Sequence, residues 1–225
     1  MSTILTENGL IVKTQVDGCS FLSSELTMQM GESLEVAEDF SGSAVVLVHV
    51  TGLLDSSPPS LWPGETTIQH VTKWERILRR IERANVQTIV LVEGLCSSIA
   101  LELLLVADWR LAVGQFKVNL TLPRGSVWPS MALYRLSRQI GEARIRKLYL
   151  SGIDLNKEVA LELGIIDNVV DDLAAGLSDI ERFLARAPLR NFAVSRRLIQ
   201  DSQLTEYQDA LGVHLAACER VLRGG

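Results

Sequence analysis

The chain is predicted to be an α/β protein built on a mainly parallel sheet. Its strongly apolar segments at 44–50, 89–92 and 109–113 are short and rich in β-branched residues, which is typical of strands buried on both faces. Helical patterns separate these segments along the chain. A strand, helix, strand order predicts parallel strands joined by right-handed crossovers.

The N-terminal part is expected to contain a strand at 10–16 and then a helix that follows Ser23 and runs to about Asp39. Ser23 offers an N-cap and Glu25 an acid for the first turn. The apolar residues of this helix fall on one face, which predicts the following buried positions: Leu26, Met30, Leu34 and Ala37.

A loop rich in proline, serine and glycine is expected over 53–67, because its prolines forbid regular helix. An amphipathic helix follows from Ile68. Its buried stripe is predicted to consist of Val71, Trp74, Ile77, Leu78 and Ile81. The charged residues of this helix, 73–83, are expected to form a solvated face, with an arginine contact to a phosphate as the alternative.

The stretch from Thr88 to Val113 is expected to carry the function of the chain. The strand at 89–92 is predicted to end at Glu93-Gly94, and 99–107 reads as a buried helix because it is apolar, long and rich in leucine and alanine. A second strand is predicted at 109–113. The sequence therefore places a buried helix between two central strands.

One carboxylate, Glu102, lies in the middle of this apolar helix. Burying it ionised costs on the order of several kcal/mol without partners, and desolvation should raise its pKa towards values useful to a general acid or base. Two interpretations stay open: Glu102 is a catalytic proton carrier, or it pairs with a buried arginine or caps a neighbouring loop. Asp108, at the end of the helix, is expected to bond loop amides and to be structural.

The rest of the chain is predicted to be mostly helical. A short strand and loop are expected after Val113, followed by a helix that begins near Pro129 and ends at Gly141. Further helices are predicted over 142–150, 156–163, 172–186, 188–200 and 204–223, with an apolar run at 165–170.

Composition restricts the class of protein. With 225 residues, of which 47% are hydrophobic, the chain can bury one core with an appendage and is not disordered. A net charge of −5 argues against a nucleic-acid partner or a polybasic membrane surface. Neither a signal peptide nor a spanning helix is apparent, and three widely spaced cysteines suggest reduced thiols, so a cytoplasmic protein is expected. The three histidines lack metal-ligand spacing, so no metal site is expected.

Between Val92 and Ala112, a glycine (Gly94), a triplet (Ser98-Ile99-Ala100), a glutamate (Glu102) and an aspartate six positions on (Asp108) follow one another. In this order they resemble the signature of the enoyl-CoA hydratase/isomerase family, the crotonase superfamily. The likeness continues downstream through nearly the whole chain. It implies an α/β crotonase (ClpP/crotonase) fold of repeated ββα units, with a core domain at 1–171 and a C-terminal helical segment of the same fold at 172–225.

The resemblance implies an oxyanion hole in which two backbone N–H groups stabilise a thioester enolate. Ile99 occupies the usual glycine position of the first donor. The second donor falls on Pro63, which has no N–H, or one residue on, on Gly64. Glu102 matches the proton-carrying glutamate, whereas the second glutamate of hydratases falls on Leu122, which transfers no proton. Ordinary hydration is therefore not expected, while dehydration, a double-bond shift or enolate protonation after C–C cleavage remains within reach.

The expected substrate is an acyl-CoA thioester, and coenzyme A enters only as part of it, without a further cofactor. Its binding residues are predicted to be Ser98, Leu122, Arg124 and Arg197. Arg124 can meet a thioester, a carboxylate or the phosphates, and Arg197 falls near a basic position that the family places against the nucleotide end of coenzyme A; solvated positions are the alternative for both. A serine peptidase of related fold is rejected, because no histidine follows Ser97-Ser98 before His214.

Three segments, WPGETTIQHVTKWERILRRIER, SVWPSMALYRL and HLAACERVLR, most resemble the DpgB-type homologues of the dihydroxyphenylglycine pathway. That likeness implies dehydration or isomerisation in an aromatic polyketide route, a type III polyketide synthase as partner, and a homotrimer or hexamer. A non-catalytic partner that stimulates the synthase is the main alternative, favoured by Leu122 and Pro63, while Glu102 favours an enzyme. An acyl-CoA decarboxylase is the third interpretation.

Overall fold

The computed structural model describes residues 1–6, 9–53, 63–118, 128–150, 154–186, 192–202 and 204–223. The chain divides into two compact units, 1–187 and 188–225. The first contains the sheet and ends with α7 (Leu173–Arg186), and the second contains α8 (Phe192–Asp201) and α9 (Tyr207–Leu222). The division expected after residue 171 falls ahead of α7, which the structure groups with the sheet.

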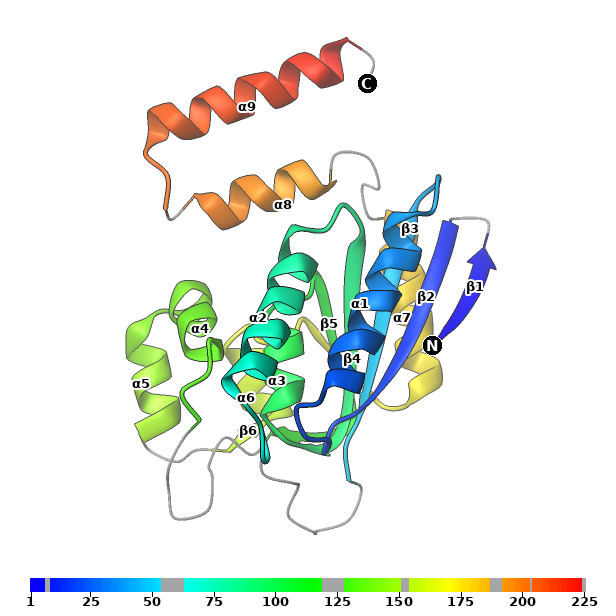
Figure 1. Cartoon of the computed structure of the whole chain (residues 1–225), viewed down its shortest axis with the longest axis vertical. Helices are drawn as coiled ribbons and strands as arrows, with labels where there is room; N and C mark the ends of the chain where they lie inside the picture. Colours follow the sequence, from blue (N-terminus) through cyan, green and yellow to red (C-terminus); the bar gives the residue numbers. More distant parts are fainter. Residues whose placement is uncertain are drawn as a thin grey trace. The chain divides into compact units, whose positions relative to one another are not determined.

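The sheet has the order β1-β2-β3-β4-β5-β6, with β7 also paired to β5 (Figure 1). Its strands are β1 (Ser2–Thr6), β2 (Gly9–Asp17), β3 (Ala44–Thr51), β4 (Gln87–Cys96), β5 (Trp109–Val118), β6 (Leu155–Asn156) and β7 (Asn168–Val170). The strands β2 to β5 and β7 run parallel, whereas β1 and β6 pair antiparallel with β2 and β5. The predicted mainly parallel sheet is confirmed. β1 has no counterpart in the prediction, because all its residues are exposed and show no buried period.

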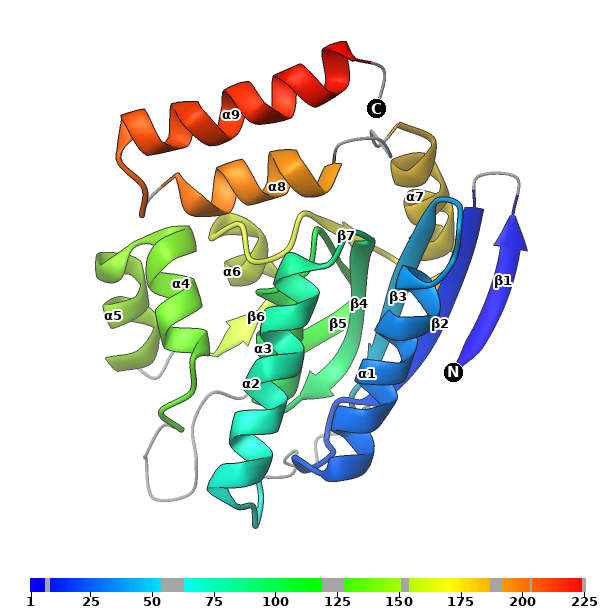
Figure 2. The same ribbon diagram turned by 45° about the horizontal axis from the view of Figure 1, so that its top comes forward.

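Two helical layers explain why the central strands are apolar throughout. Three helices, α1 (Ser24–Glu38), α2 (Ile68–Arg83) and α3 (Ser98–Leu104), share one core with the even-numbered residues of β3 and β4. The odd-numbered residues of the same strands pack with α7 through Ile180 and Leu184. Figure 2 shows α1, α2 and α3 on one side of the sheet and α7 on the other. Strands covered on both faces need no polar alternation.

The first two helices begin where their caps predict. Ser23 Oγ accepts a hydrogen bond from Leu26 N at 3.1 Å, and all four predicted core positions of α1 are buried. Thr67 Oγ1 caps α2 by accepting from His70 N at 3.3 Å. In α2, Trp74, Leu78 and Ile81 are buried, while the other two residues of the predicted stripe are partly buried.

Three shorter helices complete the first unit: α4 (Ala132–Ile140), α5 (Glu142–Leu150) and α6 (Lys157–Glu162). Gly141 separates α4 from α5 as predicted, with a φ of +86°. Asn156 caps α6 by accepting from Val159 N at 2.9 Å. No helix within the described ranges is long and apolar enough to cross a membrane.

The prediction that Glu93-Gly94 ends the central strand is wrong. β4 continues to Cys96, and its pairing with β5 shifts at this point from Glu93↔Val113 to Gly94↔Phe116. β5 carries two extra residues, 114 and 115, between these pairs, so the bulge lies on β5 and β4 stays paired. Gly94 itself has a φ of +75°, a conformation that glycine adopts without the strain that a Cβ would cause. β5 is correspondingly longer than the predicted 109–113.

The helix after β4 is shorter than the predicted 99–107, because it ends at Leu104 and a turn follows. That turn returns Asp108 to the start of β4. Thr88 N donates to Asp108 Oδ2, and Asp108 N donates to Thr88 O, both at 2.8 Å. Asp108 therefore bonds a backbone amide, as its structural interpretation expects, although the amide belongs to a strand and not to a loop.

We expect Gly94→Ala to lower the free energy of unfolding by more than about 3 kcal/mol, because it adds steric overlap to backbone strain. A Cβ at Gly94 would lie 2.8 Å from Leu53 O and 2.9 Å from Gly52 O. Gly141→Ala is the matched control, since its φ is also positive but nothing lies within 4 Å of the added carbon. Gly141→Ala should lower the free energy of unfolding only by the backbone strain, roughly 1–3 kcal/mol. If urea unfolding gave equal decreases in the free energy of unfolding for Gly94→Ala and Gly141→Ala, the steric overlap would be contradicted.

Candidate active site

Three segments of the chain meet at the carboxyl ends of the central parallel strands. Gly18 N donates to Thr51 O at 2.8 Å, and Ser97 N donates to Gly18 O at 2.7 Å. Leu53 and Leu95 exchange two backbone hydrogen bonds of 3.0 and 2.7 Å. The chain leaving β2, β3 and β4 is therefore tied together at the edge of the sheet where α/β proteins commonly bind ligands.

Glu102 is buried in α3 as the sequence predicts, with 1% of its surface exposed. α3 is short, and every residue from Ile99 to Leu104 is buried. A helix that is apolar on all sides lies inside the core. Glu102 thus places a carboxylate in a region that offers it little water.

Trp74 of α2 supplies a hydrogen bond to this carboxylate. Its indole Nε1–H donates to Glu102 Oε2 at 2.6 Å, and the Trp74 side chain is 2% exposed. The sequence prediction placed Trp74 in the apolar stripe and missed this bond. The available signal was the indole N–H itself, which needs an acceptor when tryptophan is buried.

Tyr149 of α5 shares this environment. Burial raises the pKa of Tyr149 to about 12, and the charge of Glu102 contributes to the increase. The phenol therefore keeps its proton throughout the physiological range. Glu102 thus has two neutral aromatic groups near it, contributed by α2 and α5.

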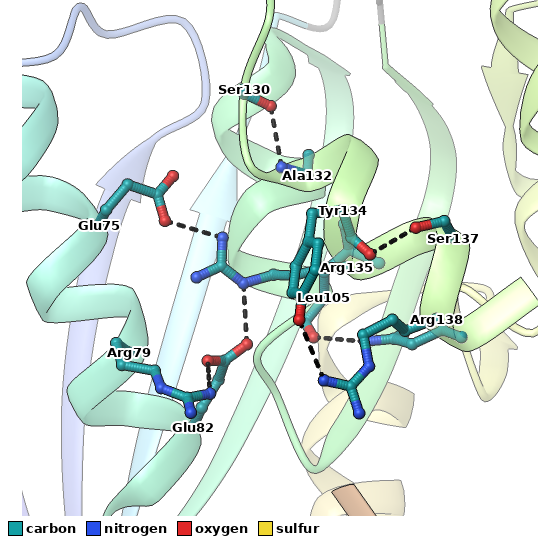
Figure 3. Close-up of polar contacts among 11 residues, drawn as sticks. Glu75, Arg79, Glu82, Leu105, Ser130, Ala132, Tyr134, Arg135, Ser137 and Arg138 are labelled. Atoms are coloured by element: carbon teal, nitrogen blue, oxygen red, sulfur yellow. Dashed lines mark hydrogen bonds and ion pairs between the residues drawn. The ribbon is translucent and has the colours of Figure 1, made fainter. Parts of the chain in front are cut away.

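Arg135 of α4 joins α4 to α2 (Figure 3). Its Nη1 donates to Glu75 Oε2 at 2.9 Å and its Nε to Glu82 Oε1 at 2.8 Å, with 7% of its side chain exposed. Burial alone would lower the pKa of Arg135, but attraction by and hydrogen bonds to Glu82 and Glu75 raise it above its usual value. The prediction of a solvated charged face on α2 is therefore wrong for these two glutamates.

α4 also bonds the end of α3, because Gln139 Nε2 donates to Leu105 O at 2.8 Å. The same short helix is therefore joined to the helix that carries Trp74 and to the helix that carries Glu102. These contacts limit how far the two helices can move relative to each other.

Both predicted oxyanion donors are among the described residues. Ile99 is fully buried in the first turn of α3, where backbone N–H groups have no acceptor within the helix. Ser98, a predicted substrate contact, is the first residue of the helix. Pro63 O accepts from Leu22 N at 3.0 Å, and Gly64, with a φ of +75°, lies against Phe21. The joint action of Ile99 and Gly64 stays a prediction.

The structure does not test the other three predicted binding residues. Leu122 and Arg124 lie outside the described residues. Arg197 lies on α8 in the second unit, with its Nε 3.8 Å from Asp201 Oδ2 of the same helix. Their roles stay predictions.

A second buried polar pair lies on strands β3 and β4. His49 Nε2 is 3.0 Å from Glu93 Oε1, and His49 is 6% exposed. Burial lowers the pKa of His49 below its usual value, and this effect exceeds the opposing attraction of Glu93. The neutral imidazole is therefore favoured in the folded protein.

We expect Arg135→Met to lower the free energy of unfolding by about 3 kcal/mol, because it leaves two partly buried carboxylates without their common cation. Arg79→Met is the matched control. Arg79 also binds Glu82, at 3.0 Å, but its side chain is 57% exposed, so its loss should cost at most about 1 kcal/mol. Equal losses for the two variants in urea unfolding would contradict the structural role of Arg135.

His49 predicts a stability loss in mild acid. Because its folded pKa lies below the unfolded value, the unfolded chain binds the proton more tightly, and stability should fall as the pH drops below about 6.5. In His49→Gln the thermal midpoint should change less between pH 7 and pH 5. His214→Gln, at an exposed position, should retain the wild-type slope. An unchanged slope in His49→Gln would rule out this origin of the pH dependence.

Comparison with known proteins gives relatives along the whole chain, although no family model matches it. The chain is 38% identical over 216 residues to a protein of Amycolatopsis orientalis named enoyl-CoA-hydratase, covering 96% of this chain and 97% of that protein. It is 26% identical over 136 residues to a mitochondrial Delta(3,5)-Delta(2,4)-dienoyl-CoA isomerase of Dictyostelium discoideum, covering 60% of this chain and 45% of the relative.

Solved structures show the same fold. An enoyl-CoA hydratase from Shewanella pealeana matches with a TM-score of 0.79 at 18% identity, covering 100% of this chain and 88% of that one. An enoyl-CoA hydratase from Thermoplasma volcanium matches with a TM-score of 0.76 at 19% identity, covering 99% and 92%. The predicted α/β crotonase (ClpP/crotonase) fold is confirmed.

Proposed function

Since the chain belongs to the enoyl-CoA hydratase/isomerase (crotonase) superfamily, we propose that it acts on an acyl-CoA thioester, with Glu102 exchanging a proton with the enolate of the acyl group. The observation that carries this proposal is the carboxylate of Glu102, buried in α3 and held by an indole N–H. A buried acid in an otherwise apolar helix is costly, and such residues concentrate at functional sites.

The enolate needs an oxyanion hole, which we assign to the backbone N–H groups of Ile99 and Gly64. Two such donors can lower the barrier by roughly 3–4 kcal/mol each when they are aimed at the developing charge. Ile99 lies in the first turn of α3, three residues before Glu102, so one short helix supplies both the donor and the acid. Pro63 has no N–H to offer, which favours Gly64 as the second donor.

The proposed reaction is dehydration or isomerisation and not ordinary hydration. Leu122 stands where hydratases carry their second glutamate, so Glu102 works as a single proton carrier. In a double-bond shift, one carboxylate removes a proton from one carbon and returns it to another. In dehydration, the carboxylate takes the α-proton and delivers it to the departing hydroxyl, which leaves as water.

We place the reaction in an aromatic polyketide route that leads to a dihydroxyphenylacetyl-CoA, because three segments of the chain resemble the DpgB-type homologues of that pathway. A type III polyketide synthase is the proposed partner, and a homotrimer or hexamer the proposed assembly. Coenzyme A takes part only as the carrier of the substrate, with Ser98, Leu122, Arg124 and Arg197 as its proposed contacts.

A non-catalytic role is the second candidate, favoured by Leu122 and Pro63 at positions where active relatives need other residues. In that role the chain would bind the synthase and stimulate it. Decarboxylation is the third candidate, because it also needs an oxyanion hole, with Arg124 recognising the carboxylate that is lost.

We expect Glu102→Gln to abolish proton transfer while binding persists. With butyryl-CoA in D2O, exchange of the α-protons should fall at least about 100-fold, whereas the calorimetric affinity for butyryl-CoA should change little. Glu158→Gln, on the exposed side of α6, is the matched control and should exchange at the wild-type rate.

Three outcomes would contradict the enzymatic proposal or replace it with one of the two alternatives. Unchanged exchange in Glu102→Gln would remove Glu102 from the reaction. Stimulation of a type III synthase that survives Glu102→Ala, without any exchange by the wild type, would establish the non-catalytic role. Loss of CO2 from malonyl-CoA, seen as a product 44 mass units lighter, would establish decarboxylation.

A further inference from the structure

We infer that Trp74 is a positioning residue for Glu102: its indole N–H holds Oε2 as a hydrogen-bond acceptor, so that Oε1 is the oxygen that carries the proton to and from the acyl chain. The inference rests on the proposed function and names the residue that orients its proton carrier. Trp74 contacts the carboxylate and not the reacting atoms.

The bond itself distinguishes the two oxygens of Glu102. An indole Nε1–H is a donor only, so the 2.6 Å contact requires a lone pair on Oε2. In a carboxylic acid the carbonyl oxygen is the better acceptor, so a donor held at Oε2 favours the proton on Oε1. The bond can therefore persist when Glu102 is ionised and when it is protonated, and in both states it favours Oε1 as the oxygen that exchanges the proton.

Burial makes this orientation effective. Trp74 is 2% exposed and Glu102 1% exposed, so water competes little for the bond. Trp74 also adds no positive charge, in contrast to a buried arginine, so Glu102 is not held in a salt bridge by this contact. Tyr149 stays neutral nearby, because burial and the charge of Glu102 raise its pKa.

The surrounding contacts hold Trp74 in place. Arg135 binds Glu75, the next residue of α2, and Glu82 two turns further along (Figure 3). Gln139, also on α4, donates to Leu105 O at the end of α3. α4 therefore connects the helix of the donor with the helix of the acceptor. Such indirect support is what keeps a proton carrier within a few tenths of an ångström of its working position.

Trp74 is also a large core side chain, so the test must separate packing from positioning. Trp109 provides a matched control, because its Nε1–H donates to Asp179 Oδ2 at 3.3 Å and its ring stacks on Phe183 at 4.8 Å. Trp109 packs against the apolar cluster that includes Ile180 and Leu184 of α7, on the face of the sheet opposite to Trp74. Trp74→Phe and Trp109→Phe thus delete the same indole N–H, in each case one that donates to a carboxylate.

The experiment measures α-proton exchange of butyryl-CoA and the indole N–H signals of the full chain by 15N–1H NMR. In Trp74→Phe, kcat should fall about tenfold or more with KM nearly unchanged, whereas Trp109→Phe should retain the wild-type kcat. Replacing Trp74 by 3-benzothienylalanine, which exchanges only the N–H for sulfur, should give the same fall in kcat and covers the case in which Trp74→Phe does not fold. In Glu102→Gln, the Trp74 signal should move and the Trp109 signal should not.

The outcomes separate this inference from the proposed function. Exchange by the wild type with an unchanged kcat in both Trp74 variants would overturn the positioning role alone. An indole N–H signal of Trp74 that does not move in Glu102→Gln would also overturn the positioning role. No exchange by the wild type, combined with a Trp74 signal that responds to Glu102→Gln, would contradict the proposed function while leaving the hydrogen bond established.

Discussion

A buried carboxylate in an apolar helix is the constraint on which the candidate site depends. Glu102 has 1% of its surface exposed, and a charge or proton placed there requires partners within the protein. Trp74 provides one such partner from α2, at 2.6 Å. In the proposed reaction the position of α2 relative to α3 therefore affects Glu102, and the contacts of Arg135 and Gln139 that hold these helices support the candidate site as well as the fold.

The course of β4 also determines where the buried carboxylate lies, because β4 leads into α3. The two extra residues of β5, 114 and 115, let β4 stay paired as far as Cys96, and the short buried helix α3 with Ile99 and Glu102 follows directly. The left-handed Gly94, tightly enclosed by the backbone of Gly52 and Leu53, therefore shapes the site from outside it.

The parts that the sequence predicts well depend on local chemistry. The cap at Ser23, the stripe of α1 and the apolar runs of β3 and β4 follow from spacing within a few residues. The missed features join residues far apart in sequence: Trp74 to Glu102, and Arg135 to Glu75 and Glu82. Periodicity assigns tryptophan to the core and glutamate to the surface, and it contains no information on which distant group each side chain meets.

In the proposed reaction the thioester binds with its carbonyl oxygen beside α3. The most direct test is the infrared stretch of a 13C-labelled thioester carbonyl of butyryl-CoA, free and bound to the wild-type protein. Hydrogen bonds from Ile99 and Gly64 should polarise the carbonyl and move the band to lower frequency. A bound thioester with the frequency that it has in water would contradict the proposed oxyanion hole and, with it, the assignment of Glu102 to enolate chemistry.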